Sequence, residues 1–174
     1  MKKIMSALII GWGVLYFSGC DEETKEKILP TKMSATVNDT LWKANGRDTY
    51  KYETLNQFYI TGTSLQREIM NITIFGTQEG EYILNTDILD TTQSADVKFA
   101  AVFKRSASAG TDDIYYAKQG KVKITDINTS DQQISGNFHF NMFRASDSTF
   151  LVQDTVTVKN GTFENLKYRI KESK

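Results

Sequence analysis

Apolar and polar residues alternate in short runs from Met33 onward, and Gly, Asn, Asp, Ser and Thr separate these runs. Alternation over roughly four to eight residues is typical of strands that bury one face of a sheet. No stretch keeps a helical spacing of apolar residues over three turns. The pattern predicts an all-β domain, a single antiparallel β-sandwich of about ten short strands. A meander that closes into a lipocalin-like barrel fits the same alternation, so both folds stay open.

The first hairpin can be assigned residue by residue. Asn38 and Asp39 both tolerate positive φ, so they are predicted to form a two-residue turn. Ala35 then pairs with Trp42, and this register places both side chains on the face that collects the apolar residues. We therefore expect Trp42 in the core.

The same alternation predicts the later strands. They are expected at Phe58–Thr61, Met70–Ile74, Gly80–Leu84, Val97–Phe103, Ile114–Ala117, Val122–Ile124, Ile134–Met142, Val152–Val158 and Phe163–Ile170. Of these, Ile134–Met142 is expected to be the longest. Asn160 and Gly161 are predicted to turn the chain between the last two strands. A shift in the pattern near Asn165 predicts a β-bulge.

A different pattern precedes the domain. Two lysines follow Met1, an apolar run extends from Ile4 to Phe17, and Cys20 is the only cysteine of the chain. The apolar run is shorter than the about 20 residues that a membrane span needs, and its length suits a signal peptide. We expect a signal peptide at 1–19, a lipidated cysteine and flexible tether at 20–32, and the all-β domain at 33–174.

Residues 17–20, Phe-Ser-Gly-Cys, resemble the bacterial lipobox. The resemblance implies cleavage before Cys20 and attachment of a diacylglycerol to its sulfur, which would anchor the protein to a membrane. Asp21, Glu22 and Glu23 follow directly and resemble the surface-export signal of Bacteroidota lipoproteins. In enterobacterial sorting, an Asp in this position instead implies retention in the inner membrane. We expect a lipid anchor in the outer membrane and exposure at the cell surface.

The charge balance limits the classes of partner. Without Lys2 and Lys3, the 21 basic residues become 19, against 21 acidic residues. Such a chain has no basic field to attract nucleic acid, so no nucleic-acid partner is expected. Once Cys20 is acylated, no thiol is left for a disulfide, a metal or redox chemistry. We therefore expect no cofactor and no metal.

The only histidine does not point to catalysis. His139 lies between Phe138 and Phe140, so alternation turns its side chain toward solvent. No Gly-x-Ser-x-Gly elbow supplies a nucleophile, and no phosphate-binding glycine loop occurs. Oxygen side chains alternate between Asp126 and Asp131 as at the start of a calcium loop, but the turn glycine and the closing glutamate are missing. We expect a hairpin loop there, no catalytic residue, and a protein that is not an enzyme.

Tyrosines and short sequons are the remaining candidates. Five tyrosines offer rings for stacking against a glycan, although ordinary half-buried strand tyrosines give the same pattern: Tyr50, Tyr52, Tyr59, Tyr115 and Tyr116. Alternation buries one of the last two. Asp90-Thr91-Thr92 and Asp147-Ser148-Thr149 resemble the Bacteroidota O-glycosylation sequon, which makes Thr91 and Ser148 candidate modification sites.

Several motifs together resemble a family of small Bacteroidota lipoproteins of unknown function. They are Ala35–Ala44, Gly80–Leu84, Gly120–Thr125, Ile134–Phe138 and Asn160–Phe163. The resemblance implies an envelope lipoprotein and brings no catalytic or ligand residues. The resulting hypothesis is a non-catalytic binding or assembly module with a protein or glycan partner. The alternative is a lipocalin-like carrier that holds a small apolar ligand inside a closed barrel.

Overall fold

The computed structural model describes residues 32–85, 97–106, 112–145 and 152–172, and every regular element in these ranges is a strand. The strands are β1 (Lys32–Val37), β2 (Thr40–Lys43), β3 (Gly46–Tyr52), β4 (Gln57–Thr63), β5 (Ile69–Ile74), β6 (Gly80–Asn85), β7 (Phe99–Ser106), β8 (Asp112–Asn128), β9 (Gln133–Ala145), β10 (Val152–Lys167) and β11 (Arg169–Lys171). The all-β prediction is confirmed.

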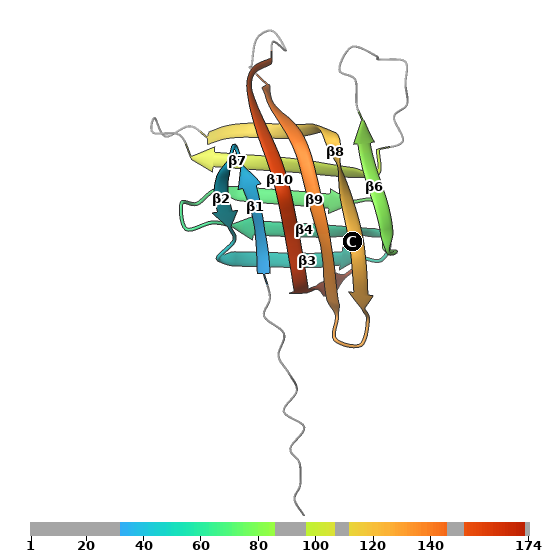
Figure 1. The fold of residues 1–174 in the computed structure, drawn as a ribbon. Helices are drawn as coiled ribbons and strands as arrows, with labels where there is room; N and C mark the ends of the chain where they lie inside the picture. Colours follow the sequence, from blue (N-terminus) through green and yellow to red (C-terminus); the bar gives the residue numbers. More distant parts are fainter. Residues whose placement is uncertain (1–31, 86–96, 107–111, 146–151, 173–174) are drawn as a thin grey trace, which may run out of the picture.

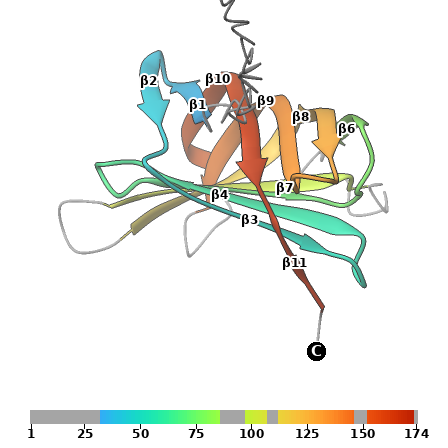
Figure 2. The same cartoon turned by 90° about the horizontal axis from the view of Figure 1, so that it is seen from below.

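All eleven strands belong to one sheet that curls over itself (Figures 1 and 2). The order is β11-β3-β4-β5-β7-β8-β9-β10-β1-β2, and β6 pairs separately with β8. Figure 2 shows two layers, one with β3, β4 and β7 and one with β1, β2, β6, β9 and β10. The neighbours are antiparallel except for β11, which pairs in parallel with β3. The curled sheet is a half-barrel, consistent with either a sandwich or a barrel.

Strand β8 serves both layers. Its first part pairs with β7 through Val102 and Tyr116, and its second part pairs with β6 through Gly80 and Ile124. The prediction of two separate strands here is wrong. Gly120 falls between the two predicted strands, but the chain continues through it as a strand, with a shift of register between Ala117 and Gln119.

Strand β10 also differs from expectation. Asn160 and Gly161 do not turn the chain; they lie inside β10, where the register shifts and Asn160 has a φ of 49°. A bulge, rather than a hairpin turn, therefore accounts for these two residues. The bulge predicted near Asn165 is confirmed by a φ of 51° and by a further register shift between Phe163 and Leu166. With 13 residues, β9 is shorter than β8 and β10, which have 17 and 16.

The predicted first hairpin is confirmed. Ala35 pairs with Trp42, and Asn38 and Asp39 have φ values of 44° and 62°. Trp42 is 3% exposed. Strand β3, by contrast, was not predicted, because its residues are mostly charged or polar and do not alternate.

One apolar core lies between the two layers. Phe138 stacks on Phe140 with ring centroids 5.1 Å apart, and Tyr168 meets Phe58 edge to face at 5.3 Å. Tyr168 joins β10 to β11, and its N–H donates to the Gln132 carbonyl at 2.8 Å. The chain thereby passes from the layer of β10 to the edge of β3, which ties the two layers together (Figure 2).

Candidate functional site

The outer surface of β3, β4, β5, β7 and the first part of β8 carries aromatic side chains. Tyr50 pairs with Tyr59 across β3 and β4, and their neighbours Thr49, Phe58 and Ile60 are buried. Phe75 directly follows buried Ile74 at the end of β5 and is 44% exposed. We call this surface the aromatic face, and define it by Tyr50, Tyr52, Tyr59, Phe75 and Tyr116. Aromatic side chains on rigid strands can contact a partner at a low cost in conformational entropy.

Polar groups lie between the rings. Thr73 follows Tyr59 in the same row, and Thr61 pairs with Asn71 in the next row. The Thr61 hydroxyl donates to the Asn71 carboxamide oxygen at 2.9 Å. Hydroxyl and amide groups among aromatic rings allow hydrogen bonds to a partner that also stacks on the rings.

The short strand β11 places cations beside Tyr50. The Arg169 guanidinium donates to the Tyr50 hydroxyl at 2.6 Å and to the Asp48 carboxylate at 2.5 Å. The Lys171 ammonium lies 3.8 Å from the centroid of the Tyr50 ring. Because these cations occupy the Tyr50 ring, the rings of Tyr59 and Phe75 are the better contact surfaces for a partner.

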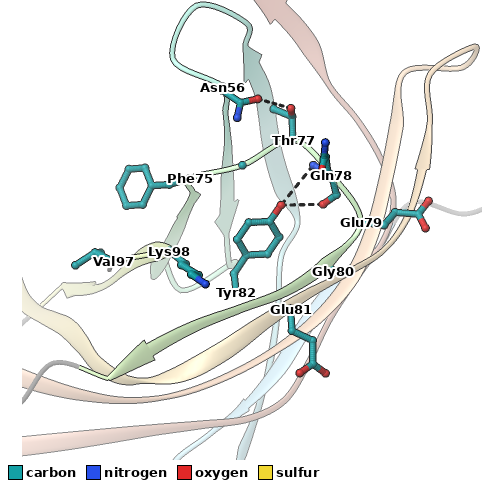
Figure 3. A pocket seen from close by; sticks show the side chains of 11 residues that line it. Asn56, Phe75, Thr77, Gln78, Glu79, Gly80, Glu81, Tyr82, Val97 and Lys98 are labelled. Carbon is teal, nitrogen blue, oxygen red and sulfur yellow. Dashed lines mark hydrogen bonds between the residues drawn. The ribbon is translucent and has the colours of Figure 1, made fainter. Parts of the chain in front are cut away.

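A hollow of about 520 Å³ adjoins the aromatic face at the loop between β5 and β6 (Figure 3). Phe75 and Tyr82 line it together with polar groups, among them Asn56 and Gln78. The Tyr82 hydroxyl donates to the Gln78 carbonyl at 2.8 Å, which fastens the loop. A Cβ on Gly76 would lie 2.5 Å from the Tyr82 ring, so the close approach of loop and ring requires glycine there. The hollow is thus shaped by its own loop.

The two carboxylates of this hollow already have partners. The Glu79 carboxylate accepts the Ile127 N–H at 3.2 Å, and the Glu81 carboxylate lies 3.2 Å from the Lys121 ammonium. Figure 3 shows both glutamate side chains directed away from Tyr82. General acid–base chemistry needs carboxyl groups that converge on a substrate. This hollow instead offers amides, hydroxyls and an aromatic rim.

Of the two adjacent tyrosines, the structure buries Tyr115 and exposes Tyr116, at 1% and 48%. One of the pair was expected to be buried, and this is confirmed. The Tyr115 hydroxyl donates to the Asp154 carboxylate at 2.7 Å. Burial, and then the hydrogen bond to Asp154, raise the pKa of the Tyr115 phenol above its ordinary value. Tyr115 therefore belongs to the core.

The other layer presents a different outer surface. His139 is exposed there, as predicted, and pairs with Lys121 on β8. Lys123 pairs with Asn137 in the next row. Amide, hydroxyl and lysine side chains thus replace the aromatic rings of the opposite surface.

The hairpin expected from Asp126 to Asp131 does connect β8 and β9, but its first three residues, 126–128, still belong to β8, and the connection itself is residues 129–132. Asn128 accepts the Asp131 N–H at 3.0 Å and donates to its carboxylate at 2.7 Å, as in an Asx-type turn. Within the described ranges, no group of three or more His, Cys, Asp or Glu side chains could hold a metal ion. Nor do those ranges contain a helix long and apolar enough to cross a membrane.

Several predicted sites lie outside the described residues. They are Cys20, Asp21, Glu22, Glu23, Thr91 and Ser148. Two contributions to the surface were missed in the sequence: Phe75 and the hollow beside it. The alternation of Met70, Ile72 and Ile74 already assigns Phe75 to the outer face, so the signal for the ring was present. The hollow had no such signal, because it joins three separate parts of the chain.

Comparison with known proteins identifies a family but no individual relative. No curated protein and no solved structure matches the chain. The model of a domain of unknown function, DUF6252, matches residues 30–167. This match covers all of the strands described above except β11. The chain therefore belongs to the DUF6252 family.

Proposed function

We propose that this protein is an outer-membrane lipoprotein, anchored through Cys20 and exposed at the cell surface, whose domain is a non-catalytic binding module. The sequence of residues 1–20 supports the anchor, and the acidic residues Asp21, Glu22 and Glu23 support export to the surface. The family match begins at residue 30, close to the end of the proposed tether at residue 32.

The aromatic face is the observation that carries the binding role. Tyr59 lies on β4 and Phe75 directly follows the neighbouring strand β5, and Phe75 and Tyr116 are 44% and 48% exposed. Aromatic residues are enriched where proteins bind partners, and exposed aromatic clusters on a rigid sheet mark interaction sites. The face is open rather than enclosed, so it suits a protein or a glycan that lies across it.

The packing between the layers disfavours the carrier alternative. A Cβ on Gly62 would lie 2.7 Å from both Met33 and Trp42, so the opposing layers already touch at this point. The rings of Phe138, Phe140 and Phe163 fill another part of the interior. A ligand in the interior would have to displace these side chains, at a cost in packing.

The anchor can be tested on intact cells. Labelled palmitate should enter the full-length protein and should not enter a Cys20→Ala variant. Added protease should digest the protein on intact cells, and alanine replacement of Asp21, Glu22 and Glu23 should protect it until lysis. Protection of the unaltered protein would assign it to the periplasm, and an unlabelled protein would contradict lipidation.

The binding role needs a partner panel and a matched control. Two measurements test it: binding to a glycan panel and cross-linking on intact cells. Each compares the full-length wild type with Tyr59→Ala and Phe75→Ala. Leu41→Ala is the control, because Leu41 is 63% exposed on the other layer and also loses apolar surface. We expect the two aromatic variants to lose a partner that Leu41→Ala keeps. Equal binding by all three variants would contradict a role for the aromatic face.

The O-glycosylation proposal is separate. Thr91 and Ser148 each follow an aspartate and precede a threonine in the sequence. We expect the mature protein to have a mass above that of its lipidated chain, and the excess to fall with Thr91→Ala or Ser148→Ala. A mature mass equal to that of the lipidated chain would contradict the modification.

A further inference from the structure

Strand β10 contains one extra residue where it passes the only histidine. Lys159 and Asn160 together lie opposite His139 on β9. The register of β9 and β10 shifts there, between Val158 and Gly161, and the pairing of β10 with β1 is irregular at the same place. A bulge of this kind separates the strands locally and changes the direction of side chains, which is why bulges are common beside functional sites.

The bulge opens a hollow of about 580 Å³ between β9 and β10. The polar side chains of this bulge hollow are Asn137, His139, Lys159, Asn160 and Thr162. The backbone at the bottom of the hollow packs against the core, since a Cβ on Gly161 would lie 2.3 Å from the ring of Phe138. Phe138 in turn stacks on Phe140 with ring centroids 5.1 Å apart. The shape of the bulge hollow is therefore set before any ligand arrives.

Among the described residues, the lining includes one lysine and one histidine, and no aspartate or glutamate. The Lys159 ammonium has a carboxylate of Asp39 at 3.9 Å, and the Asp39 side chain is 90% exposed. A pair this long and this exposed is weak, so the ammonium can turn to a better acceptor. The amides of Asn137 and Asn160 and the Thr162 hydroxyl can also donate hydrogen bonds.

We propose that the bulge hollow binds a phosphate group. Lys159 supplies the positive charge, and His139 supplies a ring N–H from the opposite strand. The neutral donors bind the oxygens that these two groups do not reach. Charge-assisted hydrogen bonds from several sides suit an anion with several oxygens. Free phosphate and the headgroup of an anionic lipid share this chemistry. The proposal does not depend on the aromatic face or on its partner.

A neighbouring lysine provides the control. His139 also borders a second hollow on its other side, which Lys121 lines. Lys121 pairs directly with His139 across the strands, but its ammonium lies 3.2 Å from the Glu81 carboxylate. It is thus as close to the histidine in the sheet as Lys159 is, yet it already has an anionic partner.

The histidine is a built-in reporter, because it is the only one in the chain. We would titrate the full-length protein, in a non-ionic detergent, with inorganic phosphate and follow the ring C–H resonances of His139. The pH is held constant, and phosphate replaces chloride so that the ionic strength also stays constant. We expect a saturable shift. Lys159→Gln should weaken the apparent affinity about tenfold, as loss of a charge-assisted hydrogen bond does. Lys121→Gln should change it less than about twofold.

Three outcomes would overturn the proposal. They are a His139 shift that does not saturate, a shift that Lys159→Gln leaves unchanged, and equal weakening by the two lysine variants. A second titration, with short-chain phosphatidic acid in the detergent micelles, distinguishes the sources of phosphate. Tighter binding than inorganic phosphate, lost in Lys159→Gln, would identify a lipid headgroup. Equal or weaker binding would identify a soluble phosphate.

Discussion

Gly62 on β4 lies directly against the ring of Trp42 on β2, across the interior between the two layers. A Cβ on Gly62 would lie 2.7 Å from Trp42 Cη2 and 2.7 Å from the sulfur of Met33. The indole of Trp42 is 3% exposed, and its N–H has no hydrogen-bond acceptor among the residues that the structure describes. The layers therefore come close enough at this point that only a residue without a side chain fits between them.

Gly62→Ala should destabilise the protein. The added methyl group would force Trp42 and Met33 to move within a packed core, which costs about 1–3 kcal/mol in the free energy of unfolding. Gly46→Ala is the control on neighbouring β3, because its Cβ would lie 3.7 Å from Thr63, an ordinary contact. Chemical denaturation of the three proteins checks the prediction. Equal unfolding free energies for the two variants would show that the layers can separate freely.

Tyr168 ties the two layers together. Its ring is 3% exposed and meets Phe58 edge to face. Tyr168→Ala should lower the free energy of unfolding by about 3–5 kcal/mol, because it leaves a cavity and loses an aromatic contact. Ile170→Ala, two residues later and 47% exposed, should change it by less than about 0.5 kcal/mol. Thermal unfolding of both variants gives the comparison. A Tyr168→Ala variant as stable as Ile170→Ala would contradict the claim that Tyr168 holds the two layers together.

The faces of most strands could be predicted from the sequence, because alternation decides which side chains are buried. In β5, for example, Met70, Ile72 and Ile74 are all buried as expected. Strand β3 was missed because Arg47, Asp48 and Lys51 interrupt its pattern. It forms because β4 pairs with it along its whole length, and this long-range contact leaves no local signal.

Glycines were the main source of error. Gly161 is predicted in a turn and Gly120 falls between two predicted strands, yet each lies inside a long strand. In both, a Cβ would meet the neighbouring strand at 2.3 Å, so the glycine permits close packing rather than a turn. The surface features could be predicted only in part. Alternation identifies outward-facing rings, but the hollows depend on how distant segments meet.

The turn between β1 and β2 offers a stabilising substitution. Asp39 has a φ of 62° in the second turn position, where glycine has no steric cost. Asp39→Gly should therefore leave the free energy of unfolding unchanged or raise it, by up to about 1 kcal/mol. Its ion pair with Lys159 is too exposed to offset this. The measurement is the midpoint of denaturation in urea, and a clear loss of stability would contradict the assignment of the turn.

Asn38, the first residue of that turn, should respond in the opposite way. Its side-chain oxygen accepts the Thr157 N–H at 2.8 Å, and its φ is 44°. Asn38→Ala loses this hydrogen bond and places a β-carbon in the left-handed region, so it should cost about 1–2 kcal/mol. Asn38→Gly, which relieves the backbone and loses only the hydrogen bond, is the matched control. Equal losses in the two variants would assign the whole effect to the hydrogen bond.

The buried phenol of Tyr115 predicts how stability depends on pH. Burial, and then the hydrogen bond to Asp154, raise its pKa in the folded protein above the ordinary value of 10.0. The folded state thus holds this proton more tightly than the unfolded state. The stability linked to this proton is fully present below pH 10.0 and is lost as the pH rises through the folded pKa.

Between about pH 8 and pH 11.5, the unfolding free energy of the wild type should fall more steeply than that of Tyr115→Phe once the phenol begins to titrate. At neutral pH the variant should be less stable by about 1 kcal/mol, because it lacks the hydrogen bond to Asp154. Tyr116→Phe, at the exposed neighbour, controls for the loss of a phenol group. Urea denaturation at several pH values gives both profiles. Parallel profiles for the wild type and Tyr115→Phe would mean that the phenol has the same proton affinity in the folded and unfolded states.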